Sequence, residues 1–128
     1  MPGIAGLETI QTFHNAKMIG DPRSTWGNLE DNPVQDMARE VNRMCKPDFM
    51  LNVALNKRKE ITAAFAGEVF EAHKEGCAYV KEHAMFKCHQ RFEVVIATNS
   101  GYPLDQNLYQ TVKGMSAASK IVKEDGNI

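Results

Sequence analysis

The strongest constraint on the fold is an almost unbroken apolar run at residues 92–98, which reads FEVVIAT. A strand that is apolar on both faces is usually an inner strand, often parallel to its neighbours, and helices must cover its sheet. The turn Asn99–Pro103 follows, and Asp105 is a candidate N-cap for a helix. This helix is predicted from apolar residues that recur with the helical period: Leu108, Val112, Met115, Ala118 and Val122.

A β-hairpin is predicted over residues 49–66. Alternate positions of its first strand are apolar, a period that puts one set of side chains on the core face: Phe49, Leu51, Val53 and Leu55. The charged segment Lys57–Glu60 has the length of a hairpin turn, and residues 61–66 are short, β-branched and aromatic before Gly67.

Helices are predicted on both sides of the hairpin. Asn32 is a candidate N-cap, Pro33 suits the first helical position, and Gln35 is able to complete a capping box for a helix that runs to about Cys45. A second amphipathic helix is expected over residues 68–83, and a shorter one near the amino end stops at Gly20. The predicted fold class is therefore α/β: a mixed sheet covered by helices, with a β-hairpin and a strand–turn–helix unit.

Composition narrows the classes of function. The chain has 128 residues, with 43% apolar and 24% charged side chains, which is typical of an ordered globular domain. Its 15 basic and 16 acidic residues give a net charge of -1, which disfavours non-specific nucleic-acid binding. No apolar run approaches the roughly 20 residues of a membrane span, and the first residues are unlike a signal peptide, so we expect a cytoplasmic protein. The three cysteines lack CxxC spacing, which favours reduced thiols over disulfides or a zinc site.

Several residues could carry chemistry. Gln110 and Lys113 lie three apart on the predicted helix, where an amide and an ammonium could hold one carboxylate; the alternative is an ordinary solvated face. The turn at residues 98–105 could present backbone N–H groups to an anion, or could be purely structural. His14 is either a partly buried, hydrogen-bonded side chain or a metal ligand. Cys88 and His89 are adjacent and point apart, so a metal site there is disfavoured.

One long stretch resembles a known family. TNSGYPLDQNLYQTVKGMSAA, at residues 98–118, resembles the start of the second domain of the nickel-dependent lactate racemase family. PGIAGLETIQTFH (2–14), GNLEDNP (27–33) and DFMLNVALNKRKEITAAFAGE (48–68) are similar to successive stretches of its first domain. The resemblance covers nearly the whole chain in family order. It implies that residues 1–85 are the C-terminal part of the first domain, while 86–128 form the hinge and the opening strand and helix of the second.

The resemblance also implies a chemistry. Enzymes of this family use nickel in a pyridinium-derived pincer cofactor, which accepts a hydride from a 2-hydroxy acid and returns it to either face. His14 matches the histidine that completes nickel coordination, while Gln110 and Lys113 match the pair that holds the substrate. Candidate cofactor-binding residues are those of the turn: Ser100, Gly101 and Tyr102. The implied function is part of a 2-hydroxy-acid racemase or epimerase, and the implied partner is a small 2-hydroxy acid.

Other family features are changed or lie elsewhere. The lysine that tethers the cofactor and the two catalytic histidines would precede Met1, so we expect this chain alone to lack activity and to bind no cofactor. Gln35 replaces a histidine of the family, and Ser100–Gly101 replaces a glycine pair, which weakens the prediction of lactate specificity. We also expect a homodimer, and exchange of the carboxyl part between two copies is one way to form it. The alternatives are a non-catalytic anion-binding or assembly module and an independent nucleotide-binding domain.

Overall fold

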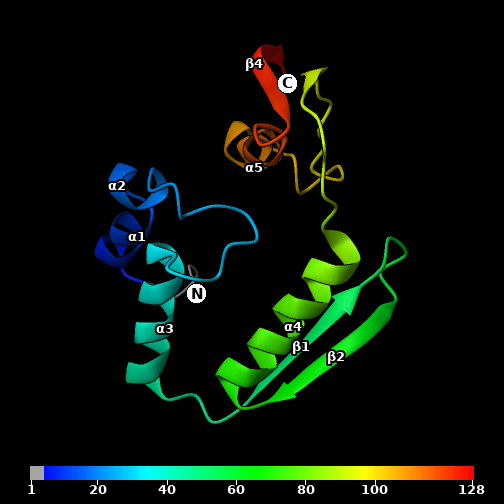
Figure 1. Ribbon diagram of the computed structural model, residues 1–128. Helices are drawn as coiled ribbons and strands as arrows, with labels where there is room; N and C mark the ends of the chain where they lie inside the picture. The colour runs from blue at the N-terminus through cyan, green and yellow to red at the C-terminus, as the bar shows by residue number, and fades with distance from the viewer. Residues whose placement is uncertain (1–4) are drawn as a thin grey trace. The chain divides into compact units, whose positions relative to one another are not determined.

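The computed structural model describes residues 5–128 and divides them into two units (Figure 1). The first unit ends at Met85, the second begins at Phe86, and each is described by itself. Residues 1–4, which include the start of the PGIAG stretch, lie outside the described residues. The first unit contains α1 (Leu7–Phe13), α2 (Ala16–Ile19), α3 (Pro33–Cys45), β1 (Met50–Leu55), β2 (Ile61–Gly67) and α4 (Val69–Ala84). The second contains β3 (Phe92–Val94), α5 (Leu108–Ala118) and β4 (Val122–Asn127).

The amino-terminal helix is broken earlier than the sequence suggests. The break falls at Asn15, whose backbone is extended and whose side chain accepts a hydrogen bond from the backbone N–H of Met18. An asparagine in this conformation starts a new helical turn instead of continuing the old one. Two short helices therefore replace the single predicted one, and His14 becomes the C-cap residue of α1.

The start of α3 agrees with the prediction. Asn32 is the N-cap, and its Oδ1 accepts hydrogen bonds from the backbone N–H groups of Val34 at 3.1 Å and Gln35 at 3.2 Å. Its Nδ2 donates to the carbonyl of Asn28 at 3.0 Å, which ties the preceding loop to the helix. The predicted capping box is only half formed, because the side chain of Gln35 makes no hydrogen bond with the residues that the structure describes. Pro33 occupies the first helical position, as expected.

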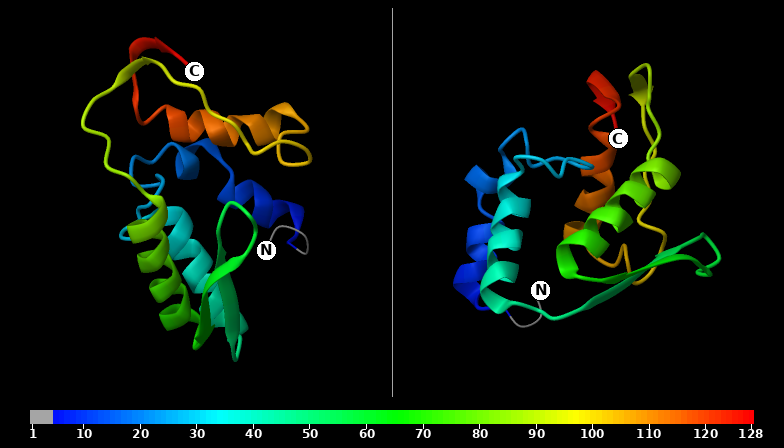
Figure 2. Two further views of the ribbon diagram at one scale, coloured as in Figure 1. Left: turned by 90° about the vertical axis from the view of Figure 1, so that its right-hand side faces the viewer. Right: turned by 60° about the horizontal axis from the view of Figure 1, so that its bottom comes forward.

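The hairpin forms as predicted, with antiparallel pairs that include Asn52↔Phe65 and Leu51↔Ala66. Helix α4 lies along one face of it (Figures 1 and 2). Phe65 faces this helix: its ring centroid is 5.5 Å from that of Tyr79, and a Cβ at Gly76 would lie 3.2 Å from Phe65 Cδ2. The glycine therefore lets the helix approach the sheet closely.

The covered face of the hairpin differs from the expected one. Residues on opposite strands of a pair share a face, so Asn52 lies on the side of Phe65, and Leu51 on the other side. The set predicted for the core is exposed, with Leu51 at 66% and Leu55 at 55% of their maximal accessibility. The reason is that α4 packs against the alternate set, where Gly76 lies against Phe65. An apolar hairpin face thus remains open in the described chain.

The second unit contains the predicted strand–turn–helix, with three changes. Strand β3 pairs in parallel with β4, as expected of such a run, but it ends at Val94 and both its faces are exposed. The helix begins after Asn107 instead of Asp105, because the Asn107 side chain accepts a hydrogen bond from the backbone N–H of Gln110. It ends at Ala118, and Val122 belongs to β4.

The α/β class is confirmed, with the strands divided between two small sheets, an antiparallel pair and a parallel pair. Among residues 5–128, two apolar residues are buried, Ala72 and Ala118. Within the same residues, none of the helices has the length and apolar character needed to cross a membrane.

The double role of Asn32 leads to a stability prediction. Asn32→Ala removes the cap of α3 and the link to Asn28, and should lower the free energy of unfolding by about 1–2 kcal/mol. The matched variant is Gln35→Ala, which also removes an amide side chain, but one that makes no hydrogen bond in the described residues. This variant should change the free energy of unfolding by less than about 0.5 kcal/mol. Urea unfolding followed by circular dichroism measures both. Equal losses in the two variants would contradict this role for Asn32.

Candidate functional site

The structure brings Gln110 and Lys113 together on one face of α5. The ammonium Nζ of Lys113 donates a hydrogen bond to Gln110 Oε1 at 2.6 Å. The same Nζ lies 5.2 Å from the ring centroid of Tyr109, which is within the range of a cation–π contact. Lys113 keeps donor capacity for a further acceptor, and the amide Nε2 of Gln110 offers two N–H groups. The pair can therefore donate to both oxygens of a carboxylate, with the charge supplied by lysine.

The N-cap of α5 determines where Gln110 lies on the helix. Asn107 caps the helix through Gln110 N at 3.1 Å, and Thr111 Oγ1 donates to the carbonyl of Asn107 at 3.2 Å. Gln110 thus lies in the first turn, where the partial positive charge of the helix end also favours an anion. Gln110 is partly buried and Lys113 is exposed, so an acceptor in solvent can reach the pair.

The turn that precedes α5 belongs to the same unit. Ser100 and Gly101 both have left-handed backbones, with φ of 67° and 82°, and the carbonyl of Gly101 accepts a hydrogen bond from Leu104 N at 2.8 Å. Tyr102 is 83% exposed. A cavity of about 630 Å³ lies nearby in this unit, and its walls include residues 94–99, Thr111 and Met115, but not the turn residues Ser100–Tyr102 or the Gln110–Lys113 pair.

His14 lies in the first unit, at the end of α1. Its Nδ1 is 3.0 Å from the carbonyl oxygen of Ile10, so Nδ1 carries the proton that is donated to this carbonyl. In a neutral imidazole with this tautomer, Nε2 is the nitrogen that has a lone pair, which is the arrangement of many metal-bound histidines. The side chain is exposed, in contrast to the partly buried position considered from the sequence. Within residues 5–128, no group of three or more His, Cys, Asp or Glu side chains is arranged to hold a metal ion.

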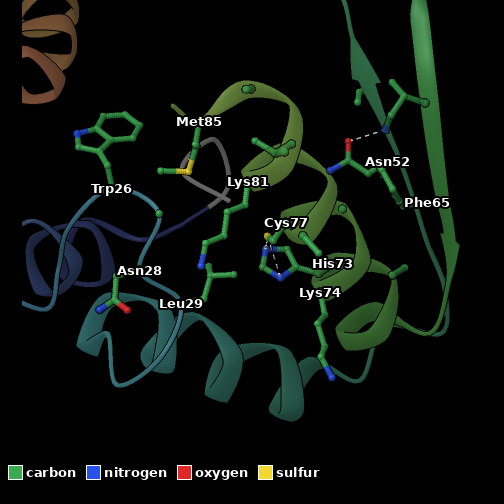
Figure 3. Close-up of a pocket in the computed structure, with 18 of the residues that line it drawn as sticks. Trp26, Asn28, Leu29, Asn52, Phe65, His73, Lys74, Cys77, Lys81 and Met85 are labelled. Carbon is green, nitrogen blue, oxygen red and sulfur yellow. Dashed lines mark hydrogen bonds between the residues drawn. The ribbon is translucent and has the colours of Figure 1, made fainter. Parts of the chain in front are cut away.

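One cavity of the first unit was not predicted. It measures about 740 Å³ and lies between α4, the hairpin and the loop that carries Trp26. Figure 3 shows side chains of α4 that point toward this loop: His73, Cys77 and Lys81. The signal that sequence reasoning missed is the spacing of four between His73 and Cys77, which places both on one helical face.

The thiol of Cys77 is held in its neutral form. Its Sγ lies 3.5 Å from His73 Nε2, within hydrogen-bonding distance for sulfur. Burial raises the pKa of this thiol, and the charge of Arg39 opposes the shift only partly. The pair therefore lacks the lowered thiol pKa that marks a nucleophilic cysteine.

Comparison with known proteins shows what this chain is similar to. Residues 88–128 match the family model described as the lactate racemase C-terminal domain. All 128 residues align with the lactate racemase of Lactiplantibacillus plantarum at 42% identity and with that of Thermoanaerobacterium thermosaccharolyticum at 38% identity. Along its whole length, this chain is similar to a segment of these lactate racemases. The resemblance seen in the sequence is thereby confirmed.

The fold agrees with that of a solved lactate racemase. The structure of the lactate racemase apoprotein from Thermoanaerobacterium thermosaccharolyticum superposes with a TM-score of 0.89 at 38% identity, over 98% of this chain and 30% of that chain. The chain also spans 30% of the length of each curated lactate racemase above. The mixed α/β arrangement of both units is therefore that of a lactate racemase segment.

The state of Cys77 can be tested by alkylation. At pH 8, iodoacetamide should modify Cys77 about tenfold more slowly than the exposed Cys45 and Cys88, because less of the Cys77 thiol is ionised and reachable. Peptide mass spectrometry at timed intervals measures all three rates in one sample, so Cys45 and Cys88 serve as internal controls. A rate for Cys77 equal to theirs would show that its pKa is not raised.

Proposed function

We propose that this chain contributes the carboxylate-binding pair and one metal ligand to a nickel-dependent 2-hydroxy-acid racemase or epimerase. The observation that carries the proposal is the contact between Lys113 Nζ and Gln110 Oε1 at 2.6 Å. Support also comes from the lactate racemases, which are similar to the chain along its whole length. In this proposal the chain without the remainder of such an enzyme has no racemase activity.

The two side chains of the pair have different roles in binding. A 2-hydroxy acid presents a carboxylate beside a hydroxyl group. Lys113 supplies the charge that favours binding of the carboxylate, and Gln110 fixes its plane by a second, neutral hydrogen bond. Two donors from fixed positions on one helix face hold the substrate in one orientation, which the reaction at its α-carbon requires.

His14 fits the metal that the proposal requires. Imidazole is a suitable ligand for nickel, and the hydrogen bond of Nδ1 to the carbonyl of Ile10 would leave Nε2 as the nitrogen that binds the metal. The left-handed turn at Ser100 and Gly101 fits the cofactor part of the proposal, because such turns expose backbone N–H groups to anionic groups. When bound, the nickel-pincer cofactor supplies the acceptor for the hydride of the substrate.

Several parts of the proposal concern the larger protein. Residues 1–85 would form the C-terminal part of the first domain, with 86–128 as hinge and opening of the second, in keeping with the family match at 88–128. The homodimer and the cytoplasmic location stay predictions. A non-catalytic carboxylate-binding module is the second candidate, because the Gln110–Lys113 pair is built within the second unit alone.

The carboxylate-binding pair can be tested by titration with lactate. In the ¹⁵N-labelled chain, lactate should shift the side-chain amide resonances of Gln110, and Lys113→Ala should weaken its affinity about tenfold or more, because a charge-assisted hydrogen bond is lost. Lys120→Ala removes another exposed lysine near the end of α5 and is the matched control. Methyl lactate, which lacks the carboxylate, should cause no shift. An equal loss in Lys120→Ala, or no shift at Gln110, would contradict the proposal.

A further inference from the structure

The turn before α5 is joined to the helix by one side chain. Asn99 Nδ2 donates a hydrogen bond to the backbone carbonyl of Gln110, eleven residues along the chain. Asn99 immediately precedes the left-handed residues Ser100 and Gly101. One amide group therefore links the start of the candidate cofactor turn to the residue that carries the carboxylate-binding amide.

Gly114 provides the space for this link. A Cβ at Gly114 would lie 2.8 Å from Asn99 Oδ1 and 3.6 Å from the Cβ of Ala97. A separation of 2.8 Å is closer than side chains tolerate, so any larger residue would push Asn99 away. Glycine inside a helix costs about 1 kcal/mol relative to alanine. Its presence in the interior of α5 is explained by the close approach of Asn99 and not by the stability of the helix.

We propose that Asn99 and Gly114 are positioning residues that hold the turn Ser100–Tyr102 in register with the Gln110–Lys113 pair. This inference rests on the proposed function of that pair. The hydrogen bond fixes the carbonyl of Gln110, and therefore the base of its side chain, relative to the turn. The position of Lys113 depends on Gln110 as well, because its Nζ donates a hydrogen bond to Gln110 Oε1. The same hydrogen bond from Asn99 therefore positions both the substrate-binding pair and the candidate cofactor turn.

A purely structural role makes a different prediction from a positioning role. If Gly114 only terminates or bends α5, replacing it by alanine should stabilise the helix and leave ligand binding unchanged. If Gly114 seats Asn99, the same replacement should raise the helix propensity while it displaces the turn and weakens binding. Stability and affinity then change in opposite directions, which a simple folding defect does not produce.

The experiment compares four forms of the ¹⁵N-labelled 128-residue chain: wild type, Gly114→Ala, Asn99→Asp and Val112→Ala. Asn99→Asp keeps the size of the side chain but removes the Nδ2 donor. Val112 is half exposed on α5, and alanine there raises helix propensity without contacting Asn99. Circular dichroism measures the helix, lactate titration measures affinity, and backbone relaxation reports the order of the turn Ser100–Tyr102.

Gly114→Ala and Asn99→Asp should each weaken lactate affinity several-fold and increase motion at Ser100–Tyr102, while Val112→Ala changes neither. Wild-type affinity and turn order in both Gly114→Ala and Asn99→Asp would overturn the inference and leave the proposed function intact. If the wild-type chain shows no lactate-dependent shift at Gln110, the proposed function fails and the inference fails with it. Should Gly114→Ala not fold, the order of the turn in Asn99→Asp decides the result, because the negative charge of aspartate would by itself weaken binding of the lactate anion.

Discussion

In both units, a helix packs closely against another segment of the same chain at a glycine. In the first unit, Gly76 of α4 lies against the ring of Phe65, and in the second, Gly114 of α5 lies against Asn99. Glycine at these two positions lets each helix come close enough for tight packing. Ala72 and Ala118, which lie on the same two helices, are buried. The other apolar surfaces are largely open in the described chain, including the hairpin face that carries Leu51. The contacts at Gly76 and Gly114 therefore determine which face of each helix is turned toward the rest of its unit.

Local signals in the sequence predict the elements, but not the faces that pack. The Asn32 cap and the pairing of the two hairpin strands depend on nearby residues, so both were predicted correctly. The face of the hairpin that α4 covers depends on Gly76, which lies far along the chain from β1, and alternation alone cannot choose between two faces. Asp105 was predicted as the cap of α5, but Asn107 caps it, and aspartate and asparagine are about equally favourable at this position.

The candidate site is predictable to a similar extent. The contact of Gln110 with Lys113 follows from a spacing of three on a helix, which needs no tertiary information. The roles of His14 and of the turn come from the resemblance to lactate racemases and stay proposals. The hydrogen bond from Asn99 to Gln110 was not predicted, because the two residues are eleven positions apart and meet only when the turn and the helix have both folded. The cavity beside His73 and Cys77 was missed although their spacing was visible.

The most direct test of the central claim is racemase activity in a chimera. The chain replaces the matching third of the Lactiplantibacillus plantarum lactate racemase, and the chimera is produced together with the enzymes that make the nickel cofactor. Chiral chromatography of lactate, with nickel measured in the same sample, gives the rate per loaded enzyme. The account predicts racemisation that Lys113→Ala abolishes and Lys120→Ala leaves unchanged. A folded, nickel-loaded chimera without activity, or one indifferent to Lys113→Ala, would contradict it.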